Sequence, residues 1–217
     1  MTVGTPSVDG AWPQTVADGC GQFFGTALRA AAPTLRPTAR VLEIGCCEYD
    51  WLKSATSIWP AMSFTGIDWR HYKRASPATL IQGDVMTQHF APGSFDWIVS
   101  ISAIEHIGLG HYAKDPVDVD GDVTTLARCW DWLAPGGWLY FDVPYNPGRY
   151  QVVGTSHRIY DEAALASRLR QGHPWREHWG GIVGKDDTST LLSVTPQKTG
   201  GEDFYYIGLW WQKPEKD

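Results

Sequence analysis

Two short stretches of the sequence combine residue types that could hold a nucleoside. Residues 41–45 are apolar apart from Glu43 and end at Gly45, and residues 64–68 form a second largely apolar stretch that ends at Asp68. Each stretch has the composition of a buried strand. A strand that stops at a glycine turn, followed by a strand closed by an acid, is how an open α/β sheet builds a nucleoside site at its carboxyl edge.

A second set of residues could move a proton. Glu105, His106 and His111 lie in segment 104–112, which contains two glycines. Imidazole accepts a proton near neutral pH, so His106 is the leading candidate for a general base, and Glu105, His111 and Tyr112 are lesser candidates. The alternative is structural, because a Glu–His pair can also order a pocket by hydrogen bonding to the backbone.

The sequence predicts no metal site. Aspartates recur through segment 115–122 and could imitate a set of oxygen ligands. An acidic loop in which Asp122 caps a helix beginning at Val123 explains the same residues. The four cysteines are Cys20, Cys46, Cys47 and Cys129, without C-x-x-C spacing, and we expect the adjacent Cys46 and Cys47 to be packed residues.

A parallel sheet is needed to bring these residues together. The sequence predicts strands at 41–45, 64–68, 79–82, 95–100 and 138–143, and helices at 49–57 and 123–133. Residues 134–137 predict a turn, and Pro144 is expected to end the fifth strand. Strands that alternate with helices call for a parallel sheet with right-handed crossovers.

The two ends of the chain differ from this alternating section. An N-terminal extension, 1–37, contains a helix predicted at 14–32. Towards the C-terminus we predict a helix at 161–170 with acids first and arginines last, then a Gly/Trp-rich connection through residue 184. Two β-rich runs, 188–194 and 204–211, flank a turn and are interpreted as an antiparallel hairpin.

Composition narrows the possible partners. The chain has 217 residues, is 43% hydrophobic and carries a formal net charge of −6, which fits one globular domain over 1–217. The basic run 70–74 is expected to be a solvated helix start, so no stripe for duplex nucleic acid is predicted and a small-molecule partner is favoured. Without a leader or a long apolar run, we expect no membrane association and a cytoplasmic, reduced location.

The order of the motifs resembles that of class I S-adenosylmethionine-dependent methyltransferases. The resemblance covers residues 39–144, as a cofactor-binding core, and leaves 145–217 as the acceptor-side wall and C-terminal strands. Its motifs are Glu43-Ile44-Gly45-Cys46-Cys47, Gly66-Ile67-Asp68, Gly83-Asp84, Phe95-Asp96-Trp97-Ile98-Val99-Ser100, Ile104-Glu105-His106-Ile107 and Leu133-Ala134-Pro135-Gly136-Gly137-Trp138-Leu139. It implies a Rossmann-like, doubly wound α/β fold with a mostly parallel seven-stranded sheet, a C-terminal antiparallel hairpin and an N-terminal helical preamble.

The resemblance also implies S-adenosyl-L-methionine as the cofactor. It assigns ten residues to the cofactor site: Glu43, Gly45, Cys46, Cys47, Asp68, Trp69, Asp84, Val85, Ser100 and Ile101. In this assignment the turn at Gly45 lies against the methionine part, Asp68 accepts from both ribose hydroxyls, and Asp84 faces the adenine amino group. Residues 100–102 line the sulfonium side, and the segment that carries His106 opens onto the acceptor.

The expected function is therefore methyl transfer to oxygen or nitrogen of a small molecule. The further glycines of a dinucleotide-binding turn are missing near Cys47 and Tyr49. A pyrophosphate needs those glycines, whereas S-adenosylmethionine has no phosphate, so NAD is disfavoured. Two alternatives stay open: a binding or scaffold protein that has lost the reaction, and a methyltransferase acting on a macromolecule through 1–37 and 172–184.

Overall fold

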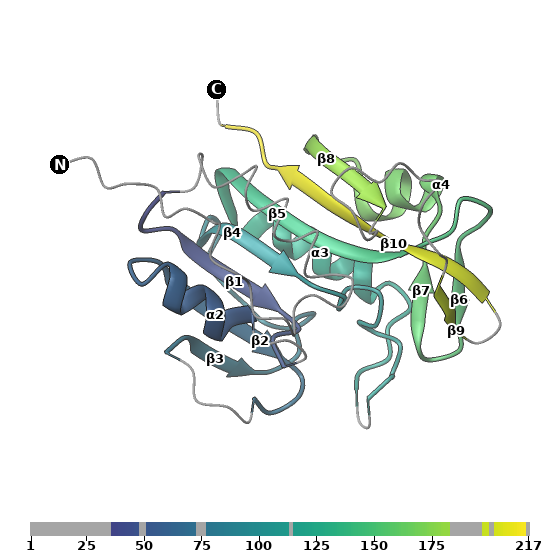
Figure 1. Ribbon diagram of the computed structural model, residues 1–217, viewed down its shortest axis with the longest axis horizontal. Helices are drawn as coiled ribbons and strands as arrows, with labels where there is room; N and C mark the ends of the chain where they lie inside the picture. Colours follow the sequence, from purple (N-terminus) through teal and green to yellow (C-terminus); the bar gives the residue numbers. More distant parts are fainter. Residues whose placement is uncertain are drawn as a thin grey trace.

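A seven-strand path forms the centre of the computed structural model, which describes residues 36–47, 51–72, 77–112, 115–182, 197–199 and 202–215. The strands lie in the order β3-β2-β1-β4-β5-β10-β8 (Figure 1). Their bounds are β1 (Arg40–Ile44), β2 (Ser63–Asp68), β3 (Thr79–Gln82), β4 (Phe95–Ser100), β5 (Leu133–Tyr145), β8 (Arg176–Ile182) and β10 (Glu202–Gln212). The short β9 (Gln197–Thr199) also pairs with β10.

Strands β1 to β5 are parallel, and β10 runs antiparallel to both β5 and β8. This arrangement confirms the predicted Rossmann-like, mostly parallel sheet with antiparallel C-terminal strands. The helix predicted at 14–32 lies outside the described residues. None of the described helices has the length and apolar character that crossing a bilayer requires.

Helices cover both faces of the sheet (Figure 1). The central strands β1 and β4 are buried nearly throughout, as expected for strands covered on two sides. Successive residues alternate between the two cores, so Leu42 packs with α3 (Gly121–Trp132) and Val41 packs with α2 (Trp51–Ile58). The sheet is therefore doubly wound.

Tryptophan rings fill much of the core on the α2 face. Trp97 from β4 meets Trp51 edge-on at 5.5 Å between ring centroids and Trp210 from β10 at 5.9 Å. Trp138 stacks on Trp210 at 5.3 Å. These contacts tie the central strands to the antiparallel strand that follows far later in the chain.

The predicted turn at 134–137 lies inside β5. Phe95 pairs with Leu133 and Trp97 pairs with Trp138, so the intervening residues of β5 bulge out of the ladder, with Gly136 at a φ of 76°. The strand also continues past its predicted end at Pro144. Proline cannot donate to a ladder, but its carbonyl accepts the Tyr160 amide.

The C-terminal predictions were right in part. Asp161 caps α4 (Glu162–Ala164), which continues as the π-helical turn η3 (Leu165–Leu169) where a helix was predicted. The predicted Gly/Trp-rich connection is wrong, because it contains β8. The run 188–194 lies outside the described residues, and the hairpin of β6 (Gln151–Val153) and β7 (His157–Ile159) was not predicted.

Candidate functional site

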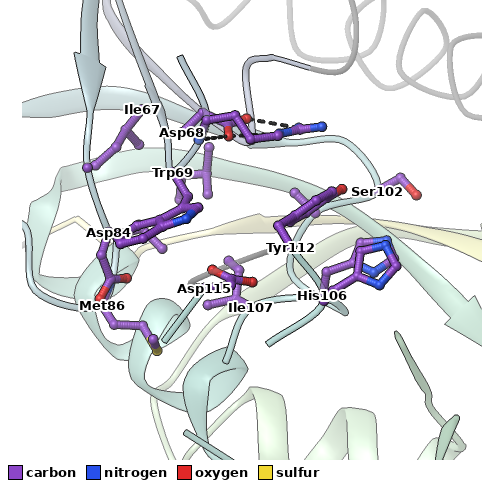
Figure 2. A pocket seen from close by; sticks show the side chains of 17 residues that line it. Ile67, Asp68, Trp69, Asp84, Met86, Ser102, His106, Ile107, Tyr112 and Asp115 are labelled. Carbon is purple, nitrogen blue, oxygen red and sulfur yellow. Dashed lines mark hydrogen bonds and ion pairs between the residues drawn. The ribbon is translucent and has the colours of Figure 1, made fainter. Parts of the chain in front are cut away.

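A pocket of about 260 Å³ opens at the carboxyl edge of the parallel strands (Figure 2). Its walls come from residues 44–45 at the end of β1, 67–70 at the end of β2, 83–86 after β3 and parts of segment 102–115 after β4. Parallel strands bring their carboxyl ends to one edge, so residues far apart in sequence meet here.

Gly45 forms the tightest corner of this pocket. Its φ is 81°, and its amide donates to the Ile67 carbonyl at 2.9 Å. A Cβ at this position would lie 2.5 Å from the Cβ of Ala103. The turn after β1 therefore requires glycine for its conformation and for its close approach to the segment after β4.

Asp68 is a buried carboxylate with several donors around it. Its oxygens accept from the Cys47 amide at 2.9 Å and the Arg70 amide at 2.8 Å. Nε and an Nη nitrogen of the Arg70 side chain each lie 3.1 Å from one of its oxygens. The Asp68 carboxylate thus links the turns that follow β1 and β2.

Arg70 belongs to the pocket and not to a solvated helix start. Its side chain is 30% exposed, and its guanidinium lies over the Tyr112 ring at 4.5 Å from the centroid. No helix is described at residues 70–72. For Arg70 the prediction is wrong, because the acid at the end of β2 attracts the arginine two residues later. Lys73 and Arg74 of the same run lie outside the described residues.

Trp69 and Asp84 line the wall near β3 (Figure 2). One oxygen of Asp84 accepts from the Met86 amide at 2.8 Å, which fixes the turn that also presents Val85. Indole offers a flat apolar face, and the other carboxylate oxygen of Asp84 can still accept. This wall can therefore take a planar group that carries a donor.

The segment after β4 begins with an unusual backbone at Ser102. Its φ of 47° is left-handed, a region that residues other than glycine seldom adopt. Two buried acids hold it: the Asp142 carboxylate accepts the Ser102 amide at 2.7 Å, and Glu105 accepts the Ser102 hydroxyl at 2.8 Å. The neighbouring elements thus stabilise a strained turn at the pocket wall.

Three histidines gather beyond that turn. The rings of His106 and His111 stack at 5.1 Å, and His157 meets His106 edge-on at 6.2 Å. Nδ1 of His106 lies 2.5 Å from the Ser156 carbonyl oxygen, and its Nε2 lies 3.7 Å from the Glu105 carboxyl. Burial is the main cause that lowers the pKa of His157, and electrostatic interaction with His106 and His111 lowers it further.

A buried arginine supports the histidine segment from behind. Arg158 is fully buried, and its guanidinium donates to the carbonyls of Ile107 at 2.8 Å and Val119 at 3.0 Å. Its Nε lies 3.5 Å from Asp122. The predicted capping role of Asp122 is wrong, because this carboxylate instead accepts from Tyr160 and Arg168.

The pocket collects seven of the predicted site residues: Gly45, Asp68, Trp69, Asp84, Val85, His106 and His111. Six others do not line it: Glu43, Cys46, Cys47, Ser100, Ile101 and Glu105. All of these but Cys47 are buried. Of residues 100–102, only Ser102 reaches the pocket, and Arg70, Met86 and Ala103 are lining residues to which sequence reasoning gave no site role.

Among the described residues, one set of potential metal ligands is close enough to share an ion: Cys46, Cys47 and Asp68. Burial is the main cause that raises the pKa of the Cys46 thiol, and the charge of Glu43 comes next. For Cys47, burial and then the charge of Asp68 raise the pKa to about 11. Both thiols keep their protons at neutral pH, and Asp68 is engaged by Arg70. This set is poorly suited to a metal.

Comparisons with known proteins agree with this architecture. A family model described as "Caenorhabditis protein of unknown function, DUF268" matches residues 56–199. Trans-aconitate 2-methyltransferase of Streptomyces avermitilis is 25% identical over 204 residues, which cover 86% of this chain. The chain spans 65% of the length of that curated relative.

Solved structures share the fold at lower identity. The 1,6-didemethyltoxoflavin-N1-methyltransferase of Burkholderia thailandensis, solved with its namesake compound and S-adenosylhomocysteine, aligns with a TM-score of 0.61 and 17% identity over 88% of this chain and 77% of its own. N-methyltransferase NodS of Bradyrhizobium japonicum, in complex with S-adenosylhomocysteine, aligns with a TM-score of 0.56 and 17% identity. The alignment covers 96% of this chain and 95% of NodS. The chain has the fold of class I S-adenosylmethionine-dependent methyltransferases.

Proposed function

The chain belongs to the DUF268 family, and we propose a function for it. It is an S-adenosylmethionine-dependent methyltransferase acting on oxygen or nitrogen of a small molecule. The observation that carries the proposal is the junction of Gly45, Asp68 and Trp69 at the carboxyl edge of β1 and β2. The methyltransferase relatives with the same fold support it. Fold alone does not assign chemistry, and the residues of the site carry the assignment.

The residues at this junction fit the proposed cofactor. Gly45 leaves room beside the turn after β1, and Asp68 is a carboxylate, the group that accepts charge-assisted hydrogen bonds from ribose hydroxyls. Trp69 and Asp84 offer the flat face and the acceptor that an adenine with its amino group needs. Behind Gly45, the buried Glu43 has one carboxyl oxygen without a partner among the described residues, which suits the amino group of the methionine part.

Glu43 would also change its ionisation on binding. Burial, followed by the charge of Asp68, raises the pKa of Glu43 well above its usual value, against a hydrogen bond from the Leu52 backbone. A cationic amino group nearby would favour the carboxylate form. Cofactor binding is therefore expected to be coupled to the loss of a proton from this site.

When bound, S-adenosylmethionine supplies a methyl group on a positively charged sulfur. The chain must hold the acceptor atom in line with that methyl and take a proton from the acceptor where there is one. Because the Ser156 carbonyl can only accept, Nδ1 of His106 carries the proton, and Nε2 has the lone pair that serves as a base. Glu105 would stabilise the imidazolium that forms, and His111 would support the ring by stacking.

Calorimetric titration with S-adenosylhomocysteine tests the cofactor assignment. We expect saturable binding by the parental chain, and binding weakened by about tenfold or more in Gly45→Ala, because the added Cβ would collide with Ala103. Gly172→Ala is the matched control: Gly172 also has a positive φ, but a Cβ there meets nothing within 4 Å. Its affinity should equal that of the parental chain.

The same titration separates the alternatives. NAD should give no saturable heat and no rise in the thermal midpoint, whereas the true cofactor raises it. Absence of any binding of S-adenosylhomocysteine to the parental chain would favour a scaffold that has lost the reaction. A methyltransferase acting on a macromolecule would bind the cofactor equally well, and methyl transfer to small molecules would then be missing.

A further inference from the structure

Four side chains form a continuous row along one side of the pocket, which we call the Arg–His row (Arg70, Tyr112, His111 and His106). The guanidinium of Arg70 lies 4.5 Å from the Tyr112 ring centroid, and the Tyr112 and His111 rings are 4.7 Å apart. His111 then stacks on His106. All four line the cavity. The row carries the permanent positive charge of Arg70 and two imidazole rings.

Acids also line the pocket, and one of them, Asp115, lies within electrostatic reach of His111. Asp68, Asp84 and Asp115 line the cavity, and burial, followed among the neighbouring acids by Asp84 and then Asp68, raises the pKa of Asp115. The carboxyl nearest to His106 is that of Glu105, whose pKa burial raises to about 7. Near neutral pH this carboxyl is only partly ionised, so it does not fully offset positive charge in the row.

Asp68 has no acceptor capacity left while Arg70 is bound to it. A carboxylate offers about four lone-pair positions. Two of them receive the backbone amides of Cys47 and Arg70, and the guanidinium of Arg70 takes the other two. Two ribose hydroxyls need two positions. The backbone donors are fixed by the turns, so the guanidinium is the group that must leave.

We propose, building on the proposed function, that the methyl acceptor carries a carboxylate, and that Arg70 binds this carboxylate once the ribose of the cofactor has displaced the guanidinium from Asp68. The planar fork of a guanidinium matches a carboxylate and can donate two parallel hydrogen bonds to it. The Tyr112 ring keeps the released guanidinium inside the pocket. His111 and His106 then lie at the far end of the same row, where the acceptor would extend. Cofactor binding therefore comes before acceptor binding.

The displacement step is tested with ligands that differ only in the ribose hydroxyls. Adenosine and 2′,3′-dideoxyadenosine are titrated into the parental chain and into Arg70→Met. We expect Arg70→Met to bind adenosine roughly threefold more tightly or better, because no charge-assisted hydrogen bond has to be broken first. Dideoxyadenosine should show no such gain. Arg176→Met, which removes an exposed arginine of β8, is the control and should leave both affinities unchanged.

The recognition step is tested with small anions. The chain saturated with S-adenosylhomocysteine is titrated with malonate, with its neutral counterpart malonamide and with inorganic phosphate. Malonate should bind, and the affinity should fall about tenfold in Arg70→Met and also when S-adenosylhomocysteine is left out. Arg70→Lys keeps the charge but loses the fork, and should recover only part of the affinity.

Several outcomes would overturn the proposal. They are equal malonate affinity in the parental chain and Arg70→Met, no saturable malonate binding, binding of malonamide as tight as that of malonate, and phosphate bound in preference to malonate. Weaker adenosine binding by Arg70→Met would exclude the displacement step. Failure of S-adenosylhomocysteine to bind the parental chain would instead reject the proposed function, so the two failures are distinguishable.

Discussion

Glu105 is a buried carboxyl group whose ionisation affects the stability of the fold. Its side chain has no exposure, and burial raises its pKa from 4.5 to about 7, against a hydrogen bond from Ser102 and the charge of Arg158. An unfolded glutamate loses its proton near pH 4.5, whereas the folded chain keeps this proton up to about pH 7. Between these values the folded state binds more protons, so the free energy of unfolding falls as the pH rises.

We therefore expect Glu105→Gln to remove a pH-dependent part of the stability. Glutamine cannot ionise but can still accept from the Ser102 hydroxyl. Urea unfolding should show that, between pH 4.5 and pH 8, the free energy of unfolding of the parental chain falls by about 3 kcal/mol relative to that of the variant. Glu43 also has a raised pKa, but it is present in both chains and cancels in the difference. Parallel pH profiles for the two chains would contradict the raised pKa of Glu105.

At the scale of residues, the sequence predicted the site best where side chains follow a strand directly. Gly45, Asp68 and Trp69 occupy such positions, and the register of a parallel sheet carries them to one edge. Arg70 was misjudged because its environment depends on the side chain of Asp68. Ser102 reaches the pocket in place of Ser100 because its left-handed backbone turns the chain. A serine at this position does not predict that conformation.

At the scale of elements, Arg158 on β7 connects three separate parts of the chain. Its guanidinium donates to Ile107 in the histidine segment and to Val119 before α3, and it lies beside Asp122 in the first turn of α3. A buried cation with these partners contributes mainly by satisfying groups that would otherwise lack donors. The short hairpin of β6 and β7 therefore supports the segment that presents His106.

Arg158→Met should destabilise the fold by about 3 kcal/mol, because it leaves buried carbonyls without donors and weakens the pairing of Asp122. Urea unfolding at neutral pH measures this change. Arg176→Met, at an exposed position on β8, should change the free energy of unfolding by less than about 0.5 kcal/mol. Equal stabilities for the two variants would show that the Arg158 contacts contribute little.

The elements that the sequence predicted are those with continuous local signals. β1, β2 and β4 are short apolar runs, and the structure places them within one residue of the predicted bounds. β8 was missed because its glycines indicate a loop, whereas pairing with β10 makes it a strand. The three-residue strands β6 and β7 are too short to show a pattern.

At the scale of the whole molecule, β10 is an interior strand although it is the last of the described elements in sequence order (Figure 1). It pairs with β5 on one side and β8 on the other, and it buries Trp210 and Trp211. A chain ending at Gly201 would leave the long β5 paired with β4 alone and would remove both indoles. Removing two buried tryptophans is expected to lower the free energy of unfolding by about 6 kcal/mol, which is comparable to the whole stability of a typical domain.

We expect the chain that ends at Gly201 not to fold. Near-ultraviolet circular dichroism should lose the signal of packed aromatic rings, and the protein should be recovered mainly as aggregate. A chain ending at Glu215 keeps all of β10 and serves as the control, with the parental spectrum. A cooperative unfolding transition in the shorter chain would show that the first five strands form a stable sheet by themselves.

The tryptophan contacts across β4 and β10 have an optical consequence. Trp51, Trp97, Trp210 and Trp138 are linked by ring-to-ring contacts, and the chain contains 12 tryptophans in total. Excitation passes readily between indoles at such separations, so the emitted light belongs to the group and not to one ring. A nucleobase that quenches Trp69 would therefore change only a small part of the total tryptophan emission.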